Sequence, residues 1–302
     1  MRLTPAVFDL DYDAAVKKIE AFIARYMKEL RRLGIVVPLS GGLDSSTALA
    51  VSVRAVGADK VRALLLPDAK GAPDALRFGR SVAKKLGVKA VIMNTTAVNR
   101  AAGVYRFIAN IVPGRKLLSW IVKRHIKRSN ENLFIDGIRG SDRPLTRQTI
   151  ASIYAKQRLR MVMTYRYAEL NRLLVVGSAH KSEDLLGLFV KFGADDAADV
   201  MPFKRLFRTQ VMEIARRTGV PEEVLARSPN PEMLPGIEDK YLDILGIPAP
   251  VVDLILKGLE LTMKDDAIAA AAGVTAAKVA ELRGLVAVSA HMRNPSLCPE
   301  FA

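Results

Sequence analysis

The sequence is poor in the residues that build disulfide and zinc sites. Its 302 residues include one cysteine, Cys298, and three histidines. A single cysteine excludes an internal disulfide framework and is typical of a protein that works in the reducing cytoplasm. With so few His and Cys side chains, we expect no structural zinc site.

Long apolar runs are missing as well. No uninterrupted apolar run approaches the roughly 20 residues that a membrane-spanning helix needs, although 50% of the residues are hydrophobic. The first residues, Met1 to Pro5, lack the apolar stretch of a secretory signal. We therefore expect a cytoplasmic protein with a sizeable core and no membrane partner.

Acidic residues are few compared with basic ones. The chain has 31 Asp and Glu against 46 Lys and Arg, which gives a formal net charge of +15. Such a balance favours anionic partners, which include polyphosphate ligands, nucleic acids and acidic proteins. A basic surface without a dedicated partner is the alternative, and the sequence leaves both open.

The first apolar run of the chain is followed by a glycine-containing turn. Residues 35–39 are typical of a buried strand. The turn that follows, here called the phosphate loop, reads Ser40-Gly41-Gly42-Leu43-Asp44-Ser45-Ser46 and opens a helix that runs to about residue 57. Backbone N–H groups and the positive end of the helix dipole converge there, so the turn predicts a phosphate-binding site. It is not a Walker loop, which has four residues between its glycines and a Lys before Ser or Thr.

Strands and helices alternate through most of the remaining chain. Apolar runs predict further strands at 61–66, 89–93 and 173–176, and helical periodicity predicts helices at 11–33, 73–86 and 149–171. Another helix is expected to end near Gly219. This alternation predicts an α/β fold with a doubly wound parallel sheet, whose site lies at the carboxyl ends of the strands.

A basic segment at about 95–147 interrupts the alternation. Its apolar residues predict two short helices separated by Pro113-Gly114, and its basic residues far outnumber its acidic ones. We interpret it as an insertion in a main domain of residues 1–260. A lid, an oligomer contact, an RNA-facing arm and a solvated basic surface all remain open for it.

Past Pro221 the chain is helical and punctuated by prolines. We expect residues 261–302 to form a helical C-terminal extension packed on the main domain. Residues 265–286 resemble a helix-turn-helix, but only Lys278 and Arg283 are placed to contact phosphates. Helix packing is therefore the favoured interpretation of this segment.

Several motifs, taken in series, resemble the ammonia-dependent NAD synthetase family of the ATP pyrophosphatase (PP-loop) superfamily. The phosphate loop is similar to the pyrophosphate loop of that superfamily. The other motifs follow with the order and nearly the spacing of the family: Arg158-Leu159-Arg160-Met161, Leu174 to Glu183, Lys191-Phe192-Gly193, Asp199 to Pro202, Phe207 to Val211, and His291-Met292-Arg293.

This resemblance implies a two-step reaction on an adenine nucleotide alpha hydrolase-like fold. A carboxylate of nicotinic acid adenine dinucleotide attacks the α-phosphorus of ATP, and ammonia then displaces AMP from the adenylate to form NAD. The family uses ATP and Mg²⁺ and forms homodimers. No glutaminase domain precedes the phosphate loop, so we expect free ammonia as the nitrogen donor.

The resemblance also assigns roles to single residues. Asp44 and Glu183 are expected to bind Mg²⁺ and, with Lys191, to be catalytic; carboxylates are suitable ligands for this cation. Capping of a helix is the alternative role for both acids. Contacts to the dinucleotide substrate are expected from Arg160, Lys191, Asp199 and His291. Contacts to ATP are expected from Ser40, Gly41, Gly42, Asp44, Ser45, Ser46, Leu66, Ser178, Arg208 and Asn230.

The chain departs from the family mainly on the acceptor side. Residues 193–197 carry one residue more than the family's Gly-Asp-Gly-Gly, Asn230 stands at a family Thr, and Lys240 stands at a family Glu. The motifs on the ATP side follow the family more closely than the motifs on the acceptor side. The resemblance therefore indicates the reaction chemistry more clearly than the identity of the acceptor. A PP-loop enzyme acting on another carboxylate or on a tRNA base, and a non-catalytic nucleotide- or nucleic-acid-binding relative, are the alternatives.

Overall fold

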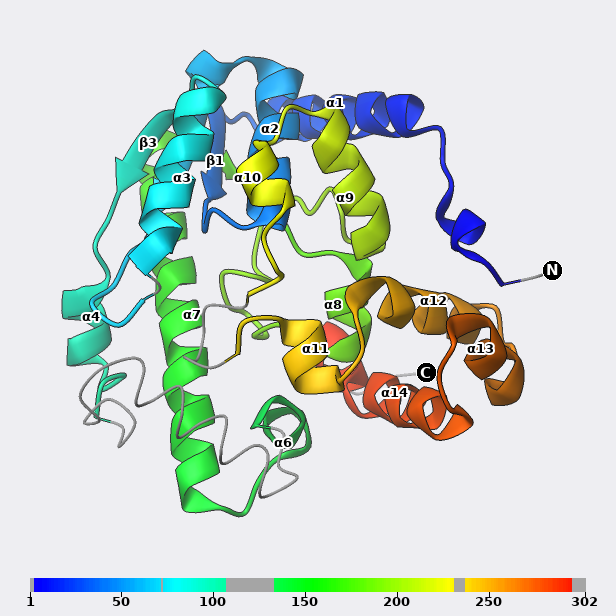
Figure 1. Cartoon of the computed structure of the whole chain (residues 1–302). Coiled ribbons are helices and arrows are strands. Elements are labelled where there is room, and N and C mark those ends of the chain that lie inside the picture. Colours follow the sequence, from blue (N-terminus) through cyan, green and yellow to red (C-terminus); the bar gives the residue numbers. More distant parts are fainter. Residues whose placement is uncertain (1–2, 72, 107–132, 231–236, 295–302) are drawn as a thin grey trace, which may run out of the picture.

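A four-stranded parallel sheet organises the computed structural model, which describes residues 3–71, 73–106, 133–230 and 237–294. The strand order is β3-β2-β1-β4 (Figure 1). The strands are β1 (Gly34–Pro38), β2 (Val61–Leu65), β3 (Lys89–Ile92) and β4 (Leu173–Val175). Val36 in β1 is in register with Arg62 of β2 and Val175 of β4. The predicted parallel sheet is confirmed.

Helices cover both faces of this sheet, because successive residues of a buried strand point to opposite sides. Ile35 and Val37 share a core with residues of α1 (Tyr12–Glu29), α2 (Leu43–Val56), α3 (Pro73–Lys85) and α9 (Arg208–Arg217). Val36 instead packs with Ala168 of α7 (Pro144–Asn171) on the opposite face. This is the doubly wound arrangement.

The long helix α7 begins five residues before the predicted start at 149. Pro144 supplies its first turn, where the missing N–H of proline costs nothing. Before it come α4 (Thr96–Ala101) and α6 (Leu133–Arg139). The two short helices predicted around Pro113-Gly114 lie outside the described residues.

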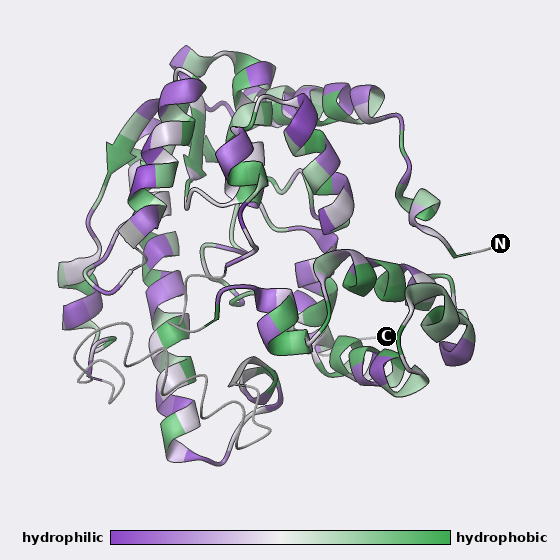
Figure 2. Cartoon of the chain, in the orientation of Figure 1, coloured by the Kyte–Doolittle hydropathy of each residue, from purple (hydrophilic) through white to green (hydrophobic). Residues whose placement is uncertain are grey.

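Most helices past β4 build a second core beside the sheet domain. They are α8 (Lys181–Leu186), α11 (Lys240–Leu245), α12 (Ala249–Glu260), α13 (Asp265–Ala272), α14 (Ala276–Val288) and α15 (Ala290–Arg293). A short 3₁₀ turn, η1 (Pro5–Phe8), adds Phe8 to this core. The short helix α10 (Glu222–Leu225) packs, like α9, in the core of the sheet domain. Apolar residues are concentrated in the strands and in α12 and α14 (Figure 2).

The segment that resembles a helix-turn-helix, α13 and α14, packs into this second core. Val279 and Leu282 of α14 are fully buried there. Lys278 donates to the carbonyl of Leu245, and Arg283 pairs with Asp265. Both cations thus have partners within the chain, as helix packing requires. Among the helices that the structure describes, none is long and apolar enough to cross a membrane.

Candidate active site

The phosphate loop joins β1 to α2 and is held by its own serines. Ser40 Oγ lies 3.0 Å from Ser45 Oγ and accepts a hydrogen bond from the N–H of Gly42 at 3.2 Å. Gly41 adopts a φ of +80°, and a Cβ there would lie 2.7 Å from the backbone nitrogen of Gly79 in α3. Glycine is required at position 41, because α3 packs directly against the turn.

Asp44 lies in the first turn of α2 and pairs with a buried arginine. Arg208, the first residue of α9, donates through Nη1 to both carboxylate oxygens of Asp44, at 3.0 and 2.9 Å. Burial alone would raise the pKa of Asp44, but the charges of Arg208, His180 and Lys240 lower it to about 2. Asp44 is therefore ionised at neutral pH.

Glu183 lies in the first turn of α8, across from Asp44. Its Oε1 accepts a hydrogen bond from the ammonium of Lys240, the first residue of α11. Both side chains are largely buried, with 13% of Glu183 and 10% of Lys240 exposed. Each acid predicted to bind Mg²⁺ thus contacts one cation of the chain.

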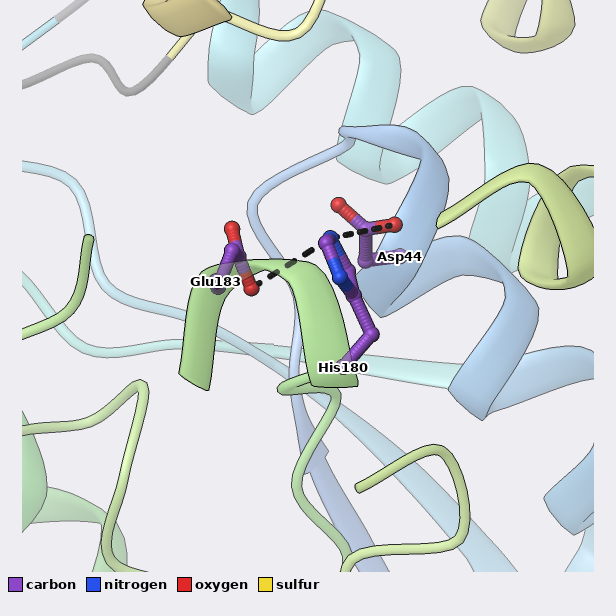
Figure 3. Close-up of side chains that lie close together, drawn as sticks. All are labelled: Asp44, His180 and Glu183. Carbon is purple, nitrogen blue, oxygen red and sulfur yellow. Dashed lines mark ion pairs between the residues drawn. The ribbon is translucent and has the colours of Figure 1, made fainter. Parts of the chain in front are cut away.

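His180 lies between these two carboxylates (Figure 3). Its Nε2 is 3.9 Å from Asp44 Oδ1 and 3.5 Å from Glu183 Oε2. Burial lowers the pKa of His180 although both carboxylates oppose the shift, so the imidazole is neutral at pH 7. The donor atoms of the three side chains all lie within 4.8 Å of one another, so this cluster can hold a divalent cation.

Two adjoining hollows open beside the cluster. One holds about 830 Å³ of empty space, counting the part open to solvent, and is lined by the carboxyl ends of β1 and β2. The other holds about 910 Å³ on the same basis and is lined by the charged residues of the cluster. Both are lined by Ser40, Ser45, Gln157, Arg160, Ser178 and Asp195.

Most residues predicted to contact ATP are brought together here. Leu66 lines the first hollow, and Gly42, Asp44, Arg208 and Asn230 line the second. The two predicted residues outside both linings are Gly41, whose carbonyl accepts from Arg227 at 2.7 Å, and Ser46, which is fully buried in α2. The other predicted residues converge on the two hollows. This convergence supports the predicted ATP site but does not assign individual contacts.

Arg160 of α7 lines both hollows and forms an ion pair with a buried aspartate. Its Nη2 lies 3.6 Å from Asp68 Oδ2, and Lys156 Nζ lies 2.6 Å from the same oxygen. The Asp68 side chain is fully buried just past the end of β2. The Arg160 side chain is 19% exposed and pairs with Asp68, so it is not an isolated surface cation, and its expected contact with the substrate stays a prediction.

The other residues predicted to contact the dinucleotide lie outside these two hollows. Lys191 Nζ donates to the carbonyl of His291 at 2.9 Å. Asp199 accepts from the N–H of Val175 at 2.8 Å and from the Tyr165 hydroxyl at 3.3 Å, which ties its loop to β4. The expected substrate contacts of Lys191, Asp199 and His291 stay predictions.

Sequence reasoning missed three residues of the site. Lys240 could have been found as a departure from the resembled family, because it brings a positive charge where that family has Glu. Asp195 lines both hollows. Burial and the charge of Glu183 raise its pKa to about 6, although the charges of Arg160 and Lys240 lower it. His180 belongs to the motif from Leu174 to Glu183, but the resemblance assigned no role to it.

Comparison with known sequences decides the family. The sequence model described as NAD synthase matches residues 15–107 and 132–296. The chain belongs to the NAD synthase family. The match omits residues 108–131, which lie within the expected basic insertion.

Curated relatives in the NAD synthase family agree with this assignment. The chain is 35% identical over 251 residues to the NH(3)-dependent NAD(+) synthetase of Coprothermobacter proteolyticus, covering 81% of this chain and 84% of the relative. It is 31% identical over 305 residues to the enzyme of the same name from Hyperthermus butylicus, covering 100% and 96%.

Solved structures show the same fold at lower identity. The NH3-dependent NAD synthetase of Campylobacter jejuni superposes with a TM-score of 0.68 at 20% identity and covers 97% of this chain and 100% of its own. The NMN synthetase of Francisella tularensis gives a TM-score of 0.71, also at 20% identity, with the same coverages. These likenesses establish the NAD synthase fold.

Proposed function

We propose that the protein is an ammonia-dependent NAD synthetase. It adenylates the carboxylate of nicotinic acid adenine dinucleotide with ATP, releases pyrophosphate, and lets ammonia displace AMP to form the amide of NAD. The observation that carries this proposal is the convergence of the phosphate loop, Asp44, Glu183 and Arg208 on one pocket. Relatives curated as NH(3)-dependent NAD(+) synthetases are 35% and 31% identical to the chain over the aligned residues.

The phosphate loop holds the leaving group of the first step. The Ser40 and Ser45 hydroxyls and the amino end of α2 meet at the pocket, where they can accept the β- and γ-phosphates. Arg208 brings a permanent positive charge to the same wall. Cations and N–H donors fixed in advance stabilise the charge that develops as the bond to the α-phosphorus breaks.

Asp44 and Glu183 are the residues that would hold Mg²⁺. Each carboxylate directs one oxygen toward the space beside His180, and carboxylate oxygens suit this hard cation. When bound, Mg²⁺ supplies neutralisation of the polyphosphate charge.

Asp195 is suited to take up the proton that leaves when ammonia becomes an amide. Its carboxyl lines both hollows, and its pKa of about 6 makes it a carboxylate that accepts protons near neutral pH. Arg160, which also lines both hollows, can hold an anionic acceptor near it.

A homodimer in the cytoplasm completes the proposal. Helix α7 exposes large apolar side chains, with Val162 54% and Leu170 68% exposed, which suits contact with a second copy. Light scattering after gel filtration measures the mass of the particle in solution. A monomer at micromolar concentration would refute the homodimer and leave the proposed reaction unaffected.

The decisive experiment measures the products formed from ATP. Purified protein is given ATP, Mg²⁺ and ammonium with nicotinic acid adenine dinucleotide, nicotinic acid mononucleotide or tRNA in parallel. We expect equal amounts of pyrophosphate, AMP and NAD with the dinucleotide and little turnover otherwise. Turnover with the mononucleotide or tRNA only would change the acceptor, and formation of ADP would overturn the reaction class.

A further inference from the structure

His180 is a buried polar side chain whose hydrogen-bonding capacity is not used. It is fully buried, and among the described residues neither Nδ1 nor Nε2 has a hydrogen-bond partner. Buried polar groups almost always have such partners, because leaving one unpaired costs on the order of 1–3 kcal/mol. A histidine kept only for packing would be expected to find a partner or to be replaced by an apolar residue.

The direction of the ring points to a ligand. Nε2 faces Asp44 Oδ1 at 3.9 Å and Glu183 Oε2 at 3.5 Å (Figure 3). These separations are too long for hydrogen bonds. Two donors on one octahedral cation are about 3.0 Å apart when adjacent and about 4.2 Å apart when opposite. The observed separations lie between these two values, so the three donors are close enough to share a cation once the side chains move slightly toward it.

Local structure explains why the three donors meet. His180 directly precedes α8, and Glu183 follows three residues later, so both project from the same side of the first turn. Asp44 arrives from the first turn of α2. Lys240 binds Glu183 through Oε1 and leaves Oε2 facing the histidine. Arg208 donates to both oxygens of Asp44, so a bound cation would share Asp44 Oδ1 with this arginine.

We propose that His180 is a third protein ligand of the cation held by Asp44 and Glu183, so that the site favours transition-metal cations such as Mn²⁺ and Co²⁺ over Mg²⁺. This inference rests on the proposed function, which supplies a divalent cation bound with ATP. Imidazole nitrogen binds first-row transition metals more strongly than it binds Mg²⁺, whereas an all-oxygen site discriminates less.

The test uses Mn²⁺ as a spectroscopic probe in the full-length protein with ATP. Protein is prepared with ¹⁵N-labelled histidine, and pulsed electron paramagnetic resonance looks for coupling between Mn²⁺ and ¹⁵N. We expect this coupling in the unsubstituted protein and its loss in His180→Asn, which retains His125 and His291. Competition between Co²⁺ and Mg²⁺ should show a preference for Co²⁺ that falls by about tenfold or more in His180→Asn.

The outcomes separate this inference from the proposed function. Bound Mn²⁺ without ¹⁵N coupling, or coupling that persists in His180→Asn, overturns the role of His180 and leaves the synthetase intact. Failure of Mn²⁺ to bind with ATP at all overturns the cation site itself. His180→Gln serves if His180→Asn does not fold, and the labelled unsubstituted protein gives an answer without any variant.

Discussion

The charges of the site are balanced residue by residue, so removing one charge should affect both folding and activity. In Asp44→Ala the buried Arg208 loses its partner, and we expect a loss of about 3 kcal/mol of stability. Pyrophosphate release should fall roughly 100- to 1000-fold, because both a cation ligand and the fixed position of Arg208 are lost. Urea unfolding and a pyrophosphate assay measure the two effects.

The double variant Asp44→Ala/Arg208→Met separates these effects, since it should regain stability but not activity. The stability effect also has a defined pH dependence. The pKa of Asp44 falls from 3.8 to about 2 on folding, so its stabilisation is complete above about pH 4 and is lost as the pH drops toward 2. An effect of Asp44→Ala that is unchanged at pH 2 would contradict the assigned ion pair.

Lys240 competes with a cation for Glu183. Its ammonium binds the Glu183 carboxylate directly, and both side chains are mostly buried. In Lys240→Met we expect the affinity for Mg²⁺ without nucleotide to rise several-fold, because Glu183 is released and a repelling charge is removed. Isothermal titration calorimetry with Mg²⁺ measures this affinity. Lys257→Met, which removes a lysine paired with Glu260 away from the site, is the matched control; equal affinities in the two variants would exclude the competition.

The ionised Asp195 carboxylate should lower the stability of the folded protein in the same pH range in which it can accept a proton. Folding raises its pKa from 3.8 to about 6, mainly through burial. The folded state therefore holds this proton more tightly, and the carboxyl costs stability as the pH rises through this interval. Asp195→Asn should be more stable than the unsubstituted protein by roughly 1–3 kcal/mol at pH 8, with no difference near pH 3.5.

Denaturant unfolding at both pH values tests the sign of this effect. The amide should also slow NAD formation more than pyrophosphate release, because a proton acceptor is needed only for the second step. A stability gain of equal size at both pH values would show that packing, not the buried charge, explains it.

Among the elements, the turn between β1 and α2 has the strictest backbone requirement. Gly41→Ala places a Cβ 2.7 Å from Gly79 N and 2.8 Å from Phe78 Cβ at a φ of +80°. Gly219 has a φ of +81° with nothing within 4 Å of the added Cβ, so Gly219→Ala carries the backbone strain alone. We expect about 1 kcal/mol of destabilisation for Gly219→Ala and at least twice that for Gly41→Ala.

The same pair of variants tests the phosphate loop. Only Gly41→Ala should raise the KM for ATP, because the clash moves the loop away from α3. Thermal unfolding and initial rates give both quantities. Equal destabilisation in the two variants would mean that α3 does not restrict the loop.

The elements were predictable from the sequence wherever local pattern decides them. Apolar runs and the two glycines located β1 and the phosphate loop, and Asp44 and Glu183 fell at one sheet edge because parallel strands end there. Lys240 is visible as a departure from the resembled family, but its contact with Glu183, like the position of Asp195, could not be predicted, because both depend on tertiary packing that no periodicity encodes. The hydrogen bond from Val175 to Asp199 likewise depends on the path of a loop.

At the scale of the whole molecule, the site lies where the two cores meet. Asp44 extends from α2, which packs in the core of the sheet domain, whereas Glu183 and Lys240 extend from α8 and α11, which pack in the core of the C-terminal helices. The ion pair from Arg208 to Asp44 therefore connects a helix that touches both cores to the phosphate loop. A ligand that contacts the loop and Glu183 together should hold the two cores in place.

This arrangement predicts that ATP stabilises the whole chain and that its phosphates are responsible. A ligand at 100 times its Kd adds about 2.7 kcal/mol, which corresponds to a rise in Tm of roughly 5 °C for a protein of this size. Scanning calorimetry should show this rise with ATP and Mg²⁺ and a comparable rise with pyrophosphate and Mg²⁺. Adenosine should have little effect, and Gly41→Ala should reduce the shift caused by pyrophosphate. A shift with adenosine that equals the shift with ATP would mean that the phosphate loop does not bind the polyphosphate.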